Sequence, residues 1–175
     1  RRVRASSRAL ELSVRVLALD TSTAVLSAAL VDGSRILGER TGEGTRAHSL
    51  MLPGVLLDLL AGAGLSLSDL DALAVGLGPG GFTSLRVGVM TMKALAYAAK
   101  LPLTGASSLA AMAHAAGRHG VLLCPALDAR KCEVYAGLYR GFPPETVVAD
   151  GTYVPEALAA ALLERGEPVA IFGEG

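Results

Sequence analysis

The residues best placed for chemistry in this sequence form a glycine-rich turn, Gly78-Pro79-Gly80-Gly81, between an apolar run and a helix expected to start at Phe82. Unpaired backbone N–H groups in such a turn can hold an anion such as a phosphate. The turn lacks the Gly-Lys-Ser/Thr ending of a P-loop and the pattern of a dinucleotide-binding motif. A tight turn that binds no ligand is therefore the simpler alternative.

Other reactive side chains in the sequence do not assemble into a recognisable catalytic set. Thr83 and Ser84 follow the glycine turn, but the motif contains no His or Lys that could activate their hydroxyls. The three histidines, His48, His114 and His119, lack the spacing of a metal-ligand cluster. The sequence therefore predicts no catalytic residue and no metal site.

Composition limits the kinds of protein that this chain can be. The chain has 175 residues, of which 51% are hydrophobic and 18% are charged, so it can form one domain or two small lobes with a sizeable core. The formal net charge is +0, which excludes a broad basic surface for nucleic acid. Residues 1–14 are rich in Arg, and we expect them to form a disordered basic extension. The absence of a signal segment and of a long apolar run favours the cytoplasm and no membrane contact.

Apolar runs and turn residues predict an alternation of strands and helices. In order, we expect strands at 15–19, 24–31 and 34–40, a loop at 41–46, a helix at 47–61, a strand at 71–77, a helix at 82–100, a strand at 101–104, a helix from Ser107 or Ser108 to about 117, strands at 121–127, 133–139 and 146–149, a helix at 155–165 and a strand at 168–172. Asp32-Gly33 is expected to form the first hairpin turn, and Thr45 to cap the first helix. The order β-β-β-α-β recurs, which indicates an α/β layer fold with mixed sheets.

Two of the predicted helices, 47–61 and 82–100, are apolar on every side, whereas an ordinary surface helix has a single apolar stripe. The charged residues of the second helix are all positive: Arg86, Lys93 and Lys100. Such helices either lie between layers of a larger core or pack against a partner. We expect a partner, because a chain of this size has little room for two internal helices, and a standard interface buries roughly 800 Å² per partner.

Four motifs occur in one order along the chain. They are Leu17-Ala18-Leu19-Asp20-Thr21-Ser22-Thr23, His48-Ser49 ahead of Leu52-Pro53, the run GPGGFTSLRVG that begins at Gly78, and Asp128-Ala129-Arg130 followed by Glu133-Val134-Tyr135. Together these motifs resemble the TsaB (YeaZ) family over about residues 15–175. The chain departs from the family at Gly81, where Ser is usual, and at Ser84, where Gly is usual.

The resemblance implies the duplicated actin-like ATPase (ribonuclease-H-like) fold, an α/β fold in which a βββαβαβα unit occurs twice. Residues 15–120 would form the first lobe. Residues 121–175 would form a partial second lobe, which is expected to be truncated because the family normally runs further at its C-terminus.

The resemblance also implies where a nucleotide site would lie. Actin-like kinases place carboxylates after the first strand of each repeat, the positions of Asp20 and Asp128 here. However, Ser22 stands where their Asp-x-Gly-Thr hairpin has glycine, and its Cβ crowds backbone that should approach phosphate. We therefore expect a vestigial site formed by Asp20, Thr21, Gly78, Gly80 and Asp128, with no tightly bound cofactor and with ATP or ADP and Mg²⁺ only in a complex.

The function implied is that of a non-catalytic scaffold subunit. It would bind the paralogue TsaD and support threonylcarbamoyladenosine modification of tRNA next to the anticodon, with TsaE as a third component, only indirect contact with tRNA, and a homodimer when alone. The expected partner interface consists of His48, Leu52, Val55, Leu56, Phe82, Leu85, Arg86 and Val89.

Two alternatives remain from the sequence. The Asp20 hairpin and the glycine turn are compatible with an actin-fold ATPase or small-molecule kinase that acts alone. A metalloprotease is a weaker alternative, because the sequence offers no metal-ligand cluster.

Overall fold

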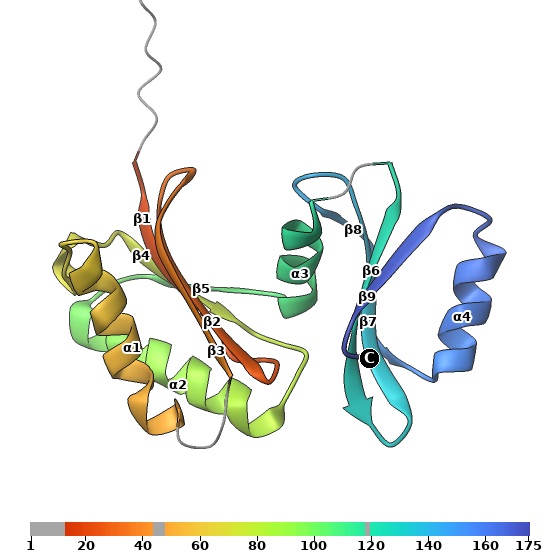
Figure 1. Cartoon of the computed structure of the whole chain (residues 1–175), viewed down its shortest axis with the longest axis horizontal. Helices are drawn as coiled ribbons and strands as arrows, with labels where there is room; N and C mark the ends of the chain where they lie inside the picture. Colours follow the sequence, from red (N-terminus) through yellow and green to blue (C-terminus); the bar gives the residue numbers. More distant parts are fainter. Residues whose placement is uncertain (1–12, 44–47, 118–119) are drawn as a thin grey trace, which may run out of the picture.

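The chain folds around two mixed β-sheets that lie next to each other along its long axis (Figure 1). The structure is a computed structural model that describes residues 13–43, 48–117 and 120–175, with only the backbone described at residues 43 and 48–51. Most of the expected basic extension, the expected cap Thr45 and His119 therefore lie outside the described residues. None of the helices in the described ranges has the length and apolar character that a membrane crossing requires.

The first sheet has the strand order β3-β2-β1-β4-β5. Its strands are β1 (Arg15–Asp20), β2 (Val25–Asp32), β3 (Arg35–Glu43), β4 (Ala72–Gly76) and β5 (Leu103–Ala106). The first three strands are antiparallel neighbours, and β1 then pairs in parallel with β4, which pairs in parallel with β5. Alternate residues point to opposite faces, so Leu17 and Leu19 are buried on one face while Ala18 and Asp20 lie on the other.

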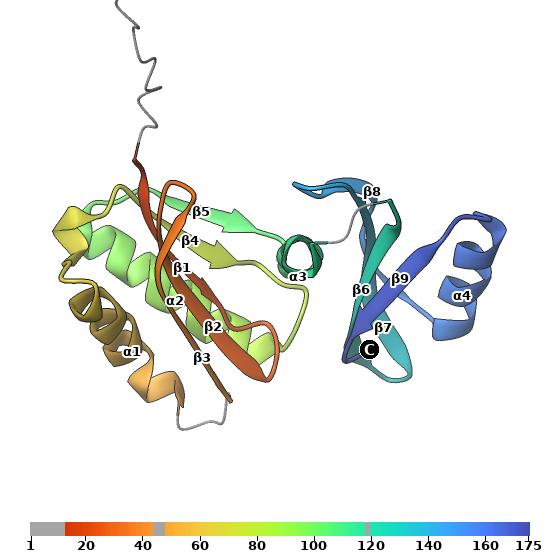
Figure 2. The same ribbon diagram turned by 45° about the horizontal axis from the view of Figure 1, so that its top comes forward.

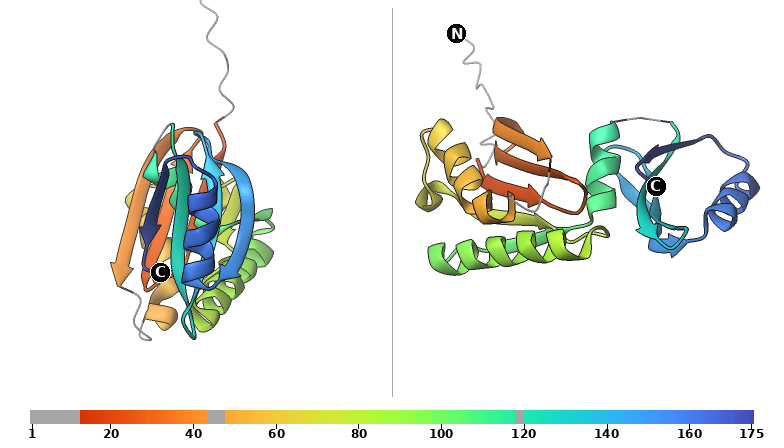
Figure 3. Two further views of the ribbon diagram at one scale, coloured as in Figure 1. Left: turned by 90° about the vertical axis from the view of Figure 1, so that its right-hand side faces the viewer. Right: turned by 60° about the horizontal axis from the view of Figure 1, so that its bottom comes forward.

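Two helices cover one face of this sheet, as Figure 3 shows for α1 (His48–Gly62) and α2 (Phe82–Ala99). A short turn of 3₁₀-helix, η1 (Leu67–Asp69), lies between α1 and β4. The first core is formed by buried side chains of the sheet and both helices, among them Leu17, Leu30, Leu73, Leu52, Leu56 and Met92. Burial of these side chains supplies the main favourable free energy of folding for this half of the chain.

The second sheet repeats the order of the first, as β8-β7-β6-β9. Its strands are β6 (Leu122–Arg130), β7 (Glu133–Arg140), β8 (Glu145–Tyr153) and β9 (Val169–Gly173). It lies between two helices, α3 (Ser108–Ala116) and α4 (Pro155–Glu164) (Figure 2). Leu123 of β6 packs against α3, whereas Leu122 and Cys124 pack in the core under α4. The repeat of element order predicted from the sequence is confirmed.

Most strands and helices lie within a few residues of their predicted positions, and three differences have clear causes. The sequence predicts a loop from residue 41, but β3 continues to Glu43 because β2 continues to pair with it, with Leu26 opposite Gly42. The predicted strand at 146–149 lies in the first half of the longer β8, which pairs along β7. The first turn uses Gly33, at φ 58°, and Ser34, while Asp32 stays in β2.

Helix α3 links the two sheets through its first turn. Ser107 caps the helix, since its Oγ accepts the Ala110 N–H at 3.1 Å, and the same hydroxyl donates to Asp150 of β8 at 2.5 Å. The hydroxyl of Tyr139, which is buried, also donates to Asp150. Helix α3 lies before residue 121, where the second lobe is predicted to start. Its apolar residues Leu109 and Ala113 nevertheless pack in the core of the second sheet.

Burial and the hydrogen bond to Asp150 raise the pKa of Tyr139 from its ordinary value of 10.0 to about 12. Between these two values the unfolded chain releases the phenol proton while the folded chain keeps it. The free energy of unfolding should therefore fall as pH rises from 10 to 12. Denaturant unfolding across this range should show a smaller decline in Tyr139→Phe than in the parent chain. Tyr97→Phe, at a tyrosine that is 89% exposed, is the control, and an unchanged decline in Tyr139→Phe would contradict the assignment.

Candidate functional site: the glycine turn and the outer helix face

The glycine turn packs directly against the loop that follows β1. The Gly81 N–H donates to the carbonyl oxygen of Ser22 at 2.7 Å, and the Thr21 hydroxyl donates to the carbonyl oxygen of Ser84 at 2.8 Å. Thr21 and Ser22 are both buried by this contact. The loop and the turn therefore hold each other in place.

Two glycines at this contact have no room for a side chain. A Cβ at Gly80 would lie 2.2 Å from the Ser22 carbonyl oxygen, and a Cβ at Gly88 would lie 2.2 Å from the Thr21 hydroxyl oxygen. Neither distance is possible between real atoms, so both positions need glycine for packing within the chain. The glycines of the motif are explained by this contact without a ligand.

The carboxylate of Asp20 is also bonded within the chain. It accepts the Ser22 N–H at 2.7 Å and the hydroxyl of Ser108 at 2.5 Å. The Ser108 oxygen in turn accepts the Gly78 N–H at 3.2 Å. The N–H groups of Gly78, Gly81 and Ser22, which could have gripped a phosphate, thus already have acceptors in the protein.

Asp128 occupies the matching place in the second sheet, but in the part of the chain that the structure describes its carboxylate bonds only within its own hairpin. Its carboxylate accepts the Arg130 N–H at 2.7 Å and lies 3.5 Å from the Arg130 guanidinium. Asp20 and Asp128 are therefore not joined by a described hydrogen bond. In the described part of the chain, no group of three or more His, Cys, Asp or Glu could hold a metal ion.

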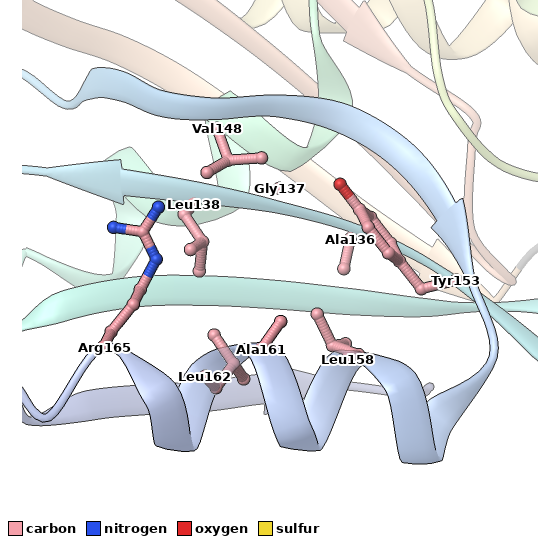
Figure 4. Close-up of a pocket in the computed structure, with 9 residues that line it drawn as sticks. All are labelled: Ala136, Gly137, Leu138, Val148, Tyr153, Leu158, Ala161, Leu162 and Arg165. Carbon is pink, nitrogen blue, oxygen red and sulfur yellow. The ribbon is translucent and has the colours of Figure 1, made fainter.

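Two hollows lie elsewhere on the described surface. One, of about 290 Å³, lies over the sheet face opposite α1 and α2, and is bordered by Asp20 and Ser107 with small side chains such as Ala18 and Ala74. The other, of about 90 Å³, lies between α4 and the second sheet (Figure 4). Its lining is almost wholly apolar, and Arg165 at one end is paired with Glu167 at 3.8 Å. The lining of the larger hollow also includes Ser27, Glu39, Arg40 and Thr41, so charged and hydroxyl groups border it, whereas Tyr153 and Arg165 are the polar side chains that line the smaller hollow.

The outer face of α2 exposes large apolar side chains to solvent. We use the name α2 outer stripe for Phe82, Arg86, Met90, Lys93 and Tyr97, which recur at three- and four-residue spacing and so lie on one side of the helix. Phe82 is 69% exposed, Met90 63% and Tyr97 89%. The Arg86 guanidinium carbon lies 3.7 Å from the centre of the Phe82 ring, a cation–π contact. Leu57 of α1 is also exposed.

The structure divides the predicted interface residues into three groups. Phe82 and Arg86 are exposed, and Val55, Leu85 and Val89 are half-buried. The prediction is wrong for Leu52 and Leu56, which are 1% and 0% exposed, because α1 turns these side chains into the first core. The side chain of His48 lies outside the described residues.

Sequence reasoning missed Met90 and Tyr97, which are the most informative exposed residues beside Phe82. Met90 and Tyr97 follow Phe82 at helical spacing, which keeps them near the same side of the helix, and this signal was available from the sequence. Ser108 was missed as a bonding partner of Asp20, because the two residues are separated by 88 positions.

The repeated strand order and the doubled β-β-β-α-β pattern define a protein of the actin-like, ribonuclease-H-like fold, in which the glycine turn is bonded to the chain itself. YeaZ from Pseudomonas aeruginosa matches this structure with a TM-score of 0.75 and 35% identity, covering 81% of this chain and 68% of that one. A second solved structure, described as similar to peptidase YEAZ from the same organism, matches with a TM-score of 0.79 and 33% identity over 93% of this chain and 85% of that one.

Sequence comparisons agree with the fold. A family model described as TsaD, tRNA N6-adenosine threonylcarbamoyltransferase, matches residues 36–161. The tRNA threonylcarbamoyladenosine biosynthesis protein TsaB of Bacillus subtilis is 34% identical over 161 residues, which are 90% of this chain and 70% of that protein. TsaB of Escherichia coli is 37% identical over 129 residues, 73% of this chain and 55% of that protein. The chain belongs to the TsaB (YeaZ) family, as its motifs predicted.

The packing of the glycine turn gives a direct test. Gly80→Ala should lower the free energy of unfolding by roughly 1–3 kcal/mol, because its Cβ would overlap the Ser22 backbone and force the turn and loop apart. Chemical denaturation of purified protein measures the loss. Gly54→Ala is the matched control, since a Cβ at Gly54 in α1 meets nothing within 4 Å. Equal stability of the two variants would show that the loop and turn do not pack as described.

Proposed function

We propose that this chain is a non-catalytic subunit that binds TsaD and supports it in the threonylcarbamoyladenosine modification of tRNA next to the anticodon. The names of its relatives, which are tRNA threonylcarbamoyladenosine biosynthesis proteins, support the pathway. The single observation that carries the subunit role is the α2 outer stripe, where Phe82, Met90 and Tyr97 are each more than half exposed on one helix. Monomeric proteins rarely leave a contiguous apolar patch of this kind uncovered.

The exposed residues lie on a rigid support, which suits a docking surface. Met92 and Ala96 of α2 are buried against the first sheet, so the opposite side of the helix is held facing outward. Because few side chains have to be ordered on binding, less free energy is lost when a partner docks. Leu57 on α1, the other helix on this face of the sheet, is a further exposed apolar residue.

The proposed function also covers nucleotide binding, tRNA contact and self-association. The chain alone binds no nucleotide tightly, since the groups that would hold a phosphate are bonded within the protein. ATP or ADP with Mg²⁺ enters with the assembled complex, in which TsaE is the third component, and tRNA contacts this subunit only indirectly. Without TsaD, the exposed helix face allows the chain to pair with a second copy.

Replacing an apolar residue of the stripe tests the proposal. Met90→Glu should weaken binding to the TsaD of the same organism at least tenfold, roughly the loss expected for a central interface residue, because a carboxylate would be buried among apolar groups. Binding is measured by pull-down and by titration with purified proteins. Leu163→Glu, at an exposed leucine of α4 in the other half of the chain, is the control and should bind normally. Equal binding by both variants would place the interface elsewhere.

Nucleotide titration separates this proposal from an ATPase or kinase that acts alone. Calorimetry of the isolated chain with ATP and Mg²⁺ should give no saturable heat at micromolar concentrations. Tight binding in the parent chain that is lost in Asp20→Ala, with the fold of the variant confirmed by circular dichroism, would support the ATPase or kinase instead.

A further inference from the structure

The charges around the α2 outer stripe have one sign. Helix α2 carries Arg86 and Lys93 and no acidic residue, and Lys100 follows directly at its end. The only Asp or Glu in α1 is Asp58, which is exposed. The apolar surface on these two helices is therefore accompanied by three cations and one carboxylate.

No ion pair in the described part of the chain neutralises Arg86, Lys93 or Lys100. Within the described residues, the ion pairs involve Arg15, Arg130, Arg140 and Arg165, and none of them involves Arg86 or Lys93. The Arg86 guanidinium carbon lies over the Phe82 ring, 3.7 Å from its centre. Stacking uses the face of the guanidinium and leaves the N–H groups at its edge free to donate to a carboxylate, often in pairs.

We infer that the α2 outer stripe fits a protein partner whose apolar face carries acidic residues, and that a second copy of this chain is the poorer occupant. This inference rests on the proposed function, because it describes the chemistry of the same docking surface. A twofold contact of the chain with itself brings identical patches together. Arg86 and Lys93 of one copy would then face the same cations of the other, with only Asp58 from each helix pair to offset them.

Salt concentration therefore acts in opposite directions on the two assemblies. Attraction between cations and carboxylates weakens as salt screens it, whereas repulsion between like charges is relieved. We measure both by sedimentation, with the chain alone and with the TsaD of the same organism, at about 50 mM and about 500 mM NaCl, a range over which screening changes strongly. The Kd for TsaD should rise at least fivefold at high salt, and self-association should stay equal or tighten.

Charge reversal at one exposed position gives the second measurement. Lys93→Glu should weaken binding to TsaD about tenfold and strengthen self-association, because the carboxylate introduced in one copy would meet the cations of the other. Lys131→Glu removes an exposed cation from the turn between β6 and β7 in the other half of the chain and is the matched control. It should leave both affinities unchanged.

The outcomes separate the two proposals. Loss of TsaD binding in Met90→Glu together with opposite effects of Lys93→Glu on the two assemblies supports both. Loss in Met90→Glu with no effect of salt or of Lys93→Glu on TsaD binding overturns the acidic partner and keeps the docking surface. Tighter TsaD binding by Lys93→Glu also overturns the acidic partner. Normal TsaD binding by Met90→Glu places the interface elsewhere and overturns this inference, whereas failure of the parent chain to bind TsaD overturns the proposed function.

Discussion

The carboxylate of Asp20 holds together three segments that are distant in the sequence. It accepts one hydrogen bond from its own loop, through the Ser22 N–H, and one from the first residue of α3, through the Ser108 hydroxyl. Ser108 also accepts the Gly78 N–H, so the glycine turn joins the same network. Because Ser108 and Ser22 are buried, loss of any acceptor would leave a donor without water to replace it. The preceding residue, Ser107, binds Asp150 of the second sheet, and the network therefore also fixes how α3 connects the two sheets.

This constraint explains how a chain can keep the actin-like fold while its glycine turn is bonded to the protein itself. A phosphate at the glycine turn would have to displace bonds that already satisfy Gly78, Gly81 and Ser22. Gly80 and Gly88 are needed because Ser22 and Thr21 press against them, so the motif serves packing in this chain. Because the glycine turn is bonded into the protein, the side of α2 that remains exposed is its outer side.

The sequence predicted the positions of strands and helices better than it predicted which side of each helix is buried. Apolar runs and the turns between them predicted the positions of β1 and β4 and the recurring β-β-β-α-β order, because these signals are local in the sequence. An amphipathic helix would also have shown which side is buried, but α1 is apolar on every side and gives no such direction. That is why Leu52 and Leu56 were assigned to the interface although they lie in the first core. The bond between Asp20 and Ser108 depends on the packing of α3 against the first sheet, and no local pattern encodes it.

The positive charges beside the stripe also bear on how the free chain avoids aggregation. The exposed side chains of Phe82, Met90 and Tyr97 favour nonspecific association of the free chain. Cations placed among apolar residues discourage contact with identical copies at little cost to a complementary partner, and specific interfaces commonly use such repulsion against the wrong partner. Arg86 serves both needs, because it shields the Phe82 ring when the face is free and keeps its edge donors available for a carboxylate. On the proposal above, the same side chains would limit unwanted association and select the surface of the partner.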